Sequence, residues 1–125
     1  AAYGSAGERC MAQSVAVAVG DIGDKLINNL SKKVEALKVG PGMDKSSEMG
    51  PLVTKEHLEK VKSYVDLGEK EGAKLLSDGR NFKKQGYEKG YFVGPTIFDD
   101  VNQDQVIYYQ SLGFQYLARH LALHG

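Results

Sequence analysis

The chain has 125 residues, of which 42% are hydrophobic and 26% charged, and its 16 basic side chains balance 16 acidic ones. These proportions are typical of a soluble globular domain, and the lack of a basic excess argues against nucleic acid as a partner. The sequence has no apolar run near the roughly 20 residues that span a bilayer, and one cysteine excludes a disulfide scaffold or multi-cysteine zinc site. We therefore expect an intracellular α/β domain, or part of one, with no leader peptide, membrane partner or metal.

The first half of the chain predicts one strand followed by two helices. The nearly all-apolar run 14–20 is typical of a central strand that is covered on both faces. Apolar residues then recur every three or four positions over 22–38, which predicts an amphipathic helix with Asp21 as its N-cap. A second helix is predicted to begin at Thr54, a residue type that favours N-caps, and to end within 68–72.

The second half predicts strands at 73–78 and 91–98, joined by an exposed, charged, hairpin-like connection over 80–90. Pro95 has no amide donor, so it places its strand at an edge, a bulge or a strand end. The segment 108–125 has leucines and aromatic residues at helical spacing, namely Leu112, Tyr116, Leu117 and Leu121. This order of elements predicts a mixed sheet flanked by helices, with a helical tail.

The segment before the first predicted strand carries the candidate chemistry. Gly4 and Gly7 allow a tight backbone just before Cys10. A thiol at the start of a helical turn lies near unpaired amides, which lower a thiol pKa, and the charge of Arg9 acts in the same direction. The same amides can donate to an oxyanion when the thiolate attacks a carbonyl. The residues alone allow a nucleophile here, and equally a small buried hydrophobic cysteine.

The same segment resembles the signature around the nucleophilic cysteine of the aldehyde dehydrogenases. That signature, Phe-Gly-x-x-Gly-x-x-Cys before a valine-rich strand, corresponds to residues 3–10, with Tyr3 in place of phenylalanine. Gly-Pro-Leu-Val at 50–53 and Gly-Tyr-Phe-Val-Gly-Pro-Thr-Ile-Phe at 90–98 resemble later motifs of the family, in the same order. The Arg-Cys-Met-Ala form at 9–12 is most similar to the CoA-acylating methylmalonate-semialdehyde dehydrogenase branch.

The resemblance implies a partial aldehyde dehydrogenase catalytic domain over residues 1–108, a mixed sheet flanked by helices, and an unmatched tail over 109–125. It implies that Cys10 attacks a semialdehyde, that NAD accepts the hydride, and that coenzyme A takes the acyl group as propionyl-CoA or acetyl-CoA. NADP in place of NAD stays open. Full-length relatives are expected to be homotetramers in the bacterial cytoplasm or, for some, the mitochondrial matrix.

The resemblance also implies roles for three other residues. Arg9 corresponds to an arginine that binds the substrate carboxylate, for which a guanidinium fork is well suited; a surface residue paired with Glu8 is the alternative. Lys60 and His57 fall where the family's helix approaches the cofactor ribose, and two solvated helix residues are an equal alternative.

Two departures from the family pattern limit what the chain can do alone. The family's dinucleotide-binding region precedes the cysteine motif, whereas only nine residues precede Cys10. In addition, Ser111 stands near the place of a glutamate that grips the nicotinamide ribose. We therefore expect the isolated chain to be inactive. A branch that hydrolyses its thioester, or an inert structural or interaction fragment, are the alternative interpretations.

Overall fold

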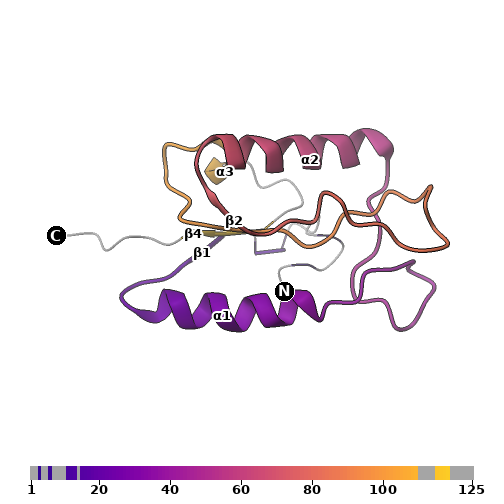
Figure 1. Ribbon diagram of the computed structural model, residues 1–125, viewed down its shortest axis with the longest axis horizontal. Helices are drawn as coiled ribbons and strands as arrows, with labels where there is room; N and C mark the ends of the chain where they lie inside the picture. Colours follow the sequence, from indigo (N-terminus) through magenta and orange to yellow (C-terminus); the bar gives the residue numbers. More distant parts are fainter. Residues whose placement is uncertain (1–2, 4–5, 7–10, 14, 110–114, 119–125) are drawn as a thin grey trace.

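The computed structural model describes residues 3, 6, 11–13, 15–109 and 115–118, in which a four-stranded sheet lies between two long helices (Figure 1). Helix α1 (Ile22–Glu35) covers one face of the sheet, and helix α2 (Lys55–Lys70) covers the other. The short helix α3 (Val106–Tyr109) lies on the α2 side. The strands are β1 (Val15–Val17), β2 (Lys74–Ser77), β3 (Ile97–Asp99) and β4 (Gln115–Ala118).

The strand order is β1-β4-β3-β2. Strand β4 runs parallel to both of its neighbours, with Leu117 opposite Ala16 and Tyr116 opposite Phe98. Strand β2 is antiparallel to β3, and the register between them shifts between Leu75 and Ser77. The mixed sheet flanked by helices that the sequence predicts is therefore confirmed.

Successive side chains of β3 contribute to the hydrophobic core on opposite faces of the sheet. Phe98, fully buried, packs with the inner face of α2, which buries Leu58, Val61 and Val65. Its neighbour Ile97 belongs instead to the cluster under α1, whose other members are Val34 and the partly buried Tyr3, Ala16, Leu26, Ile27, Leu30 and Leu76. Successive side chains of a strand point to opposite faces, so β3 joins the two helical layers.

Both long helices form where the periodicity predicts them. The Thr54 hydroxyl accepts a hydrogen bond from the His57 amide at 3.1 Å, which confirms this residue as the N-cap of α2. Asp21 occupies the N-cap position of α1, but its side chain makes no capping bond. Helix α1 also ends before Lys38, because the Lys38 carbonyl accepts the amides of Glu48 and Met49 at 2.7 and 3.2 Å.

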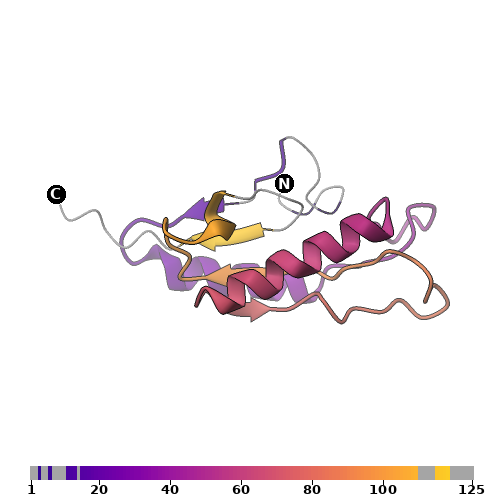
Figure 2. The same ribbon diagram turned by 90° about the horizontal axis from the view of Figure 1, so that it is seen from above.

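Two connecting loops lie together at one end of the molecule. The α1–α2 loop and the β2–β3 loop extend past the same end of the sheet in both views (Figures 1 and 2). The Leu52 amide donates to the Tyr91 carbonyl at 2.9 Å, which joins the two loops. The end of Lys84 lies beside Gly40, at the start of the first loop. In the described part of the chain, no helix is both long enough and apolar enough to cross a membrane.

Three expectations from the sequence are wrong. The run 14–20 is not a central, covered strand: β1 stands at one end of the sheet order, and Val17 is 51% exposed. The strand expected over 91–98 is confined to Ile97–Asp99, because Pro95 has no amide and the Gly94 amide bonds the Gly79 carbonyl outside the ladder. Residues 115–118 of the tail form a strand instead of the expected helix, because they gain ladder hydrogen bonds from strands on both sides.

Candidate active site

The two residues predicted to do the chemistry, Cys10 and Arg9, lie outside the described residues, so their roles stay predictions. The described residues of the same segment are Tyr3, Ala6 and 11–13. Ala6 is 1% exposed within the core, whereas Met11 is 87% exposed.

Tyr3 links the cysteine-bearing segment to the start of β3. Its hydroxyl donates to the Thr96 carbonyl at 3.2 Å, across 93 positions of sequence. Its ring packs against the clusters on both faces of the sheet. Burial raises the pKa of Tyr3 above its ordinary value, so the hydroxyl remains protonated and able to donate at neutral pH.

Ala6 has a backbone φ of +53°, in the left-handed region that residues with a side chain rarely adopt. Such a conformation costs on the order of 1 kcal/mol and persists where surrounding packing requires it. Here the packing is the core cluster under α2, in which Ala6 is buried. The segment is thus held at two points, one polar and one apolar, before Cys10.

The acceptor of the Tyr3 hydrogen bond is itself rigidly held. The Thr96 hydroxyl oxygen accepts the Gly79 amide at 3.1 Å, and the Ser77 hydroxyl donates to the Pro95 carbonyl at 3.1 Å. Thr96 is 3% exposed, so its hydrogen bond with the Gly79 amide is shielded from water. The Gly-Pro-Thr motif recognised in the sequence therefore forms the support to which the cysteine-bearing segment is attached.

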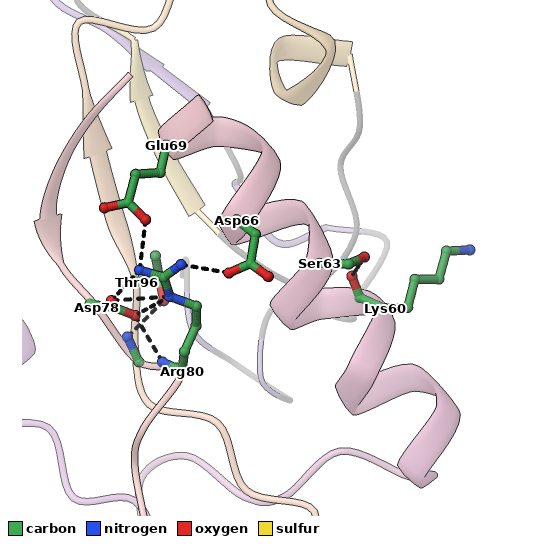
Figure 3. Close-up of polar contacts among 8 residues, drawn as sticks. Lys60, Ser63, Asp66, Glu69, Asp78, Arg80 and Thr96 are labelled. Atoms are coloured by element: carbon green, nitrogen blue, oxygen red, sulfur yellow. Dashed lines mark hydrogen bonds and ion pairs between the residues drawn. The ribbon is translucent and has the colours of Figure 1, made fainter. Parts of the chain in front are cut away.

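His57 and Lys60, the predicted cofactor contacts, lie three positions apart in the first half of α2. That spacing places them on neighbouring parts of one helix surface. His57 is partly buried, whereas Lys60 is exposed and its side chain points away from the sheet (Figure 3). The Lys60 ammonium group can only donate hydrogen bonds, and ribose hydroxyls can accept them. Their role as cofactor contacts stays a prediction.

A network around Arg80 was not foreseen from the sequence, which predicts only a charged loop there. Arg80 bonds the carboxylates of Asp66, Glu69 and Asp78, with Nη2 2.9 Å from Glu69 and 2.6 Å from Asp78 (Figure 3). Hydrogen bonding to Arg80 holds the pKa of Asp78 below its ordinary value, and the same carboxylates raise the pKa of Arg80. The network joins the second half of α2 to the end of β2. The three-residue spacing of Asp66 and Glu69, together with Asp78 and Arg80, is the signal that could have predicted it.

Glu71, just past α2, holds the segment that leads toward Ser111. Its carboxylate accepts the amides of Val106 and Ile107 at 2.8 and 3.4 Å, at the start of α3. The Gln105 side chain donates to the Glu71 carbonyl at 3.0 Å. Ser111 itself lies outside the described residues. Over the residues that are described, no group of three or more His, Cys, Asp or Glu side chains is placed to hold a metal ion.

A family model described as "Aldehyde dehydrogenase family" matches residues 1–112, nearly the whole chain. The chain belongs to the aldehyde dehydrogenase family. It is 50% identical over 109 residues to malonate-semialdehyde dehydrogenase 1 of Geobacillus thermodenitrificans, which covers 86% of this chain and 22% of that enzyme. It is 48% identical to the malonate-semialdehyde dehydrogenase of Pseudomonas aeruginosa, over 90% of this chain and 23% of the relative.

Solved structures of the aldehyde dehydrogenase family agree with the fold. A protein named methylmalonate-semialdehyde dehydrogenase from Sinorhizobium meliloti, complexed with NAD, matches with a TM-score of 0.89 and 50% identity over 94% of this chain. The methylmalonate-semialdehyde dehydrogenase of Oceanimonas doudoroffii matches with a TM-score of 0.91 and 41% identity over 98%. These matches cover 24% and 26% of the two structures, so the chain spans about a quarter of their length.

Proposed function

We propose that this chain is part of the catalytic domain of a CoA-acylating semialdehyde dehydrogenase acting on malonate or methylmalonate semialdehyde. The observation that carries the proposal is 50% identity over 86% of the chain to an enzyme named malonate-semialdehyde dehydrogenase. The family match over residues 1–112 includes the Arg9-Cys10 pair. Betaine aldehyde dehydrogenase of Staphylococcus aureus, which has the same fold, is only 28% identical. The identity therefore favours a carboxylated aldehyde as substrate.

Cys10 is the proposed nucleophile. Its thiolate forms a carbon–sulfur bond with the aldehyde carbon, and its own amide N–H donates to the resulting oxyanion. NAD, when bound, accepts the hydride that leaves this carbon, which leaves a thioester on Cys10. Loss of CO2 and transfer to the thiol of coenzyme A then give acetyl-CoA from malonate semialdehyde, or propionyl-CoA from methylmalonate semialdehyde.

Arg9 is the proposed carboxylate receptor. The planar guanidinium presents two parallel N–H donors to the two carboxylate oxygens, which orients the substrate as well as binding it. A neutral aldehyde gains nothing from such a charge beside the nucleophile. Arg9 therefore sets substrate class, whereas Cys10 does the chemistry.

Lys60 and His57 are the proposed contacts of the chain to the NAD ribose. Their shared position on α2 and the exposure of Lys60 support this assignment. The relatives named above are bacterial, and we assign the enzyme to the bacterial cytoplasm, as a homotetramer. Because the chain spans about a quarter of its relatives, we expect it to produce no NADH by itself.

The test is a chimera in which residues 1–108 replace the matching segment of the Geobacillus enzyme. We expect NADH production from malonate semialdehyde that depends on coenzyme A, and none after Cys10→Ser. Arg9→Gln is expected to lower kcat/KM for malonate semialdehyde at least tenfold more than for propanal, since a bidentate charged pair is worth roughly 1.5–3 kcal/mol.

Lys25→Gln, which removes an exposed charge on α1, is the matched control and is expected to change neither substrate. Equal losses for both aldehydes in Arg9→Gln would contradict the carboxylate role. NADH production at the same rate without coenzyme A would favour the hydrolytic branch. A chimera that folds but oxidises neither aldehyde would support an inert fragment.

A further inference from the structure

We propose that the Tyr3 hydroxyl is a positioning group for Cys10, because it holds the cysteine-bearing segment against the Thr96 carbonyl. This inference rests on the proposed function, in which the Cys10 thiol must face the aldehyde. The family signature has phenylalanine here, so the hydrogen bond is a feature of this chain that the signature does not require.

The hydrogen bond of the Tyr3 hydroxyl restricts the orientation of the side chain more than apolar packing of the ring does. Tyr3 packs against apolar clusters on both faces of the sheet, and a phenylalanine ring would keep most of that contact. A hydroxyl bonded to a main-chain carbonyl at 3.2 Å also fixes how far the ring enters and how it is turned. The position of Tyr3 is therefore set by the start of β3.

The acceptor can serve as a fixed reference because its strand has little freedom. Thr96 is 3% exposed and is bonded through its own hydroxyl to Gly79. Its successor Ile97 pairs with Gln115 on one side and Ser77 on the other. The hydrogen bond to Thr96 therefore fixes the position of Tyr3 relative to the sheet.

The second attachment, Ala6, brings the constraint to within four positions of Cys10. Ala6 is buried at φ +53°, a conformation that its surroundings must maintain. When the chain is fixed at Tyr3, fewer backbone paths lead through this conformation to Cys10. Removing the hydroxyl is expected to widen the range of thiol orientations while leaving the core in place.

The experiment compares Tyr3→Phe with the wild-type chain, and Tyr91→Phe serves as a matched control. Tyr91 is 38% exposed, and its bond with Leu52 is made by its main-chain carbonyl and not by its hydroxyl. The control therefore removes a tyrosine hydroxyl that lies outside the cysteine-bearing segment. Cys10 is the single cysteine, so iodoacetamide alkylation reports on it alone. Rates are measured from about pH 6 to about pH 9, across the ordinary thiol pKa. Urea unfolding and circular dichroism are recorded on the same samples.

In Tyr3→Phe, we expect alkylation near pH 7 to slow roughly three- to tenfold, the range set by one hydrogen bond, with the rate profile shifted to higher pH. Tyr91→Phe is expected to match wild type. A Tyr3→Phe chain that is fully folded and reacts like wild type would overturn the positioning role and leave the proposed function intact. A wild-type thiol no faster than N-acetylcysteine would also overturn the positioning role, because the segment would then hold no activated thiol, whereas the proposed function is tested separately in the chimera. A Tyr3→Phe chain that loses stability but keeps the wild-type pH–rate profile of alkylation would overturn the positioning role, because the hydrogen bond would then only stabilise the fold.

Discussion

The backbones of Gly79 and Gly94 touch. The Gly94 amide donates to the Gly79 carbonyl at 2.9 Å, and a Cβ built on Gly79 would lie 1.8 Å from the Gly94 carbonyl oxygen. No side chain fits at that separation, so glycine is required at position 79. This contact closes the β2–β3 connection and sets the position of Thr96, on which Tyr3 depends.

Gly79→Ala is expected to destabilise the chain by more than about 3 kcal/mol, because the clash is with backbone that cannot move aside without breaking β3. Urea unfolding measures the loss. Gly42→Ala is the matched control: nothing lies within 4 Å of its added methyl group, and the expected change is below about 0.5 kcal/mol. Equal stability of the two variants would contradict the close approach.

Thr96→Val is expected to lower the free energy of unfolding by about 1–3 kcal/mol, because it leaves the buried Gly79 amide without its acceptor. Thr96→Ser keeps the hydroxyl and loses only a methyl group, so it should retain most of the stability. Thermal or urea unfolding of both variants checks this. A serine variant as unstable as the valine variant would mean that methyl packing, not the hydrogen bond, is what matters.

Arg80→Gln is expected to cost about 1 kcal/mol at neutral pH, since its partners are largely exposed. Because Arg80 holds the pKa of Asp78 below its unfolded value, this stabilisation is present above about pH 4 and lost as pH falls through the lower folded pKa. The difference between wild type and Arg80→Gln should therefore shrink on acidification. A difference that stays constant from neutral pH to pH about 2 would contradict the linkage.

Truncation after Tyr109 removes β4 and is expected to release β1, which pairs with β4 in the described sheet. Amide hydrogen exchange at 15–17 should then become fast. Truncation after Ala118 keeps β4 and is the control, with exchange expected to match the full chain. Protection at 15–17 that survives the longer deletion would show that β1 does not depend on β4.

Much of the fold could be predicted because its signals are local. The periodicity of α2 and its Thr54 cap each depend on a few neighbouring residues, and the structure confirms both. The errors concern partners far away in sequence. Whether 14–20 is central and whether 115–118 is helical depend on which strands lie alongside, which a single segment does not contain.

The candidate site divides in the same way. Cys10 and Arg9 were found from a short motif, but their geometry lies outside the described residues. The Tyr3–Thr96 hydrogen bond was not predicted, because the two residues are 93 positions apart and nothing in the sequence around a tyrosine shows which group its hydroxyl will bond. The sequence shows that Tyr3 stands where the family signature has phenylalanine, but only the fold shows that its hydroxyl bonds the Thr96 carbonyl.

The most direct test of the account is to trap the acyl group on Cys10. The chimera is incubated with malonate semialdehyde and NAD in the absence of coenzyme A, and the peptide that contains Cys10 is examined by mass spectrometry. We predict an acetyl group on Cys10 that persists without coenzyme A and disappears, with formation of acetyl-CoA, when it is added. A Cys10 that never carries an acyl group, or one that loses it equally fast with and without coenzyme A, would contradict the proposed function.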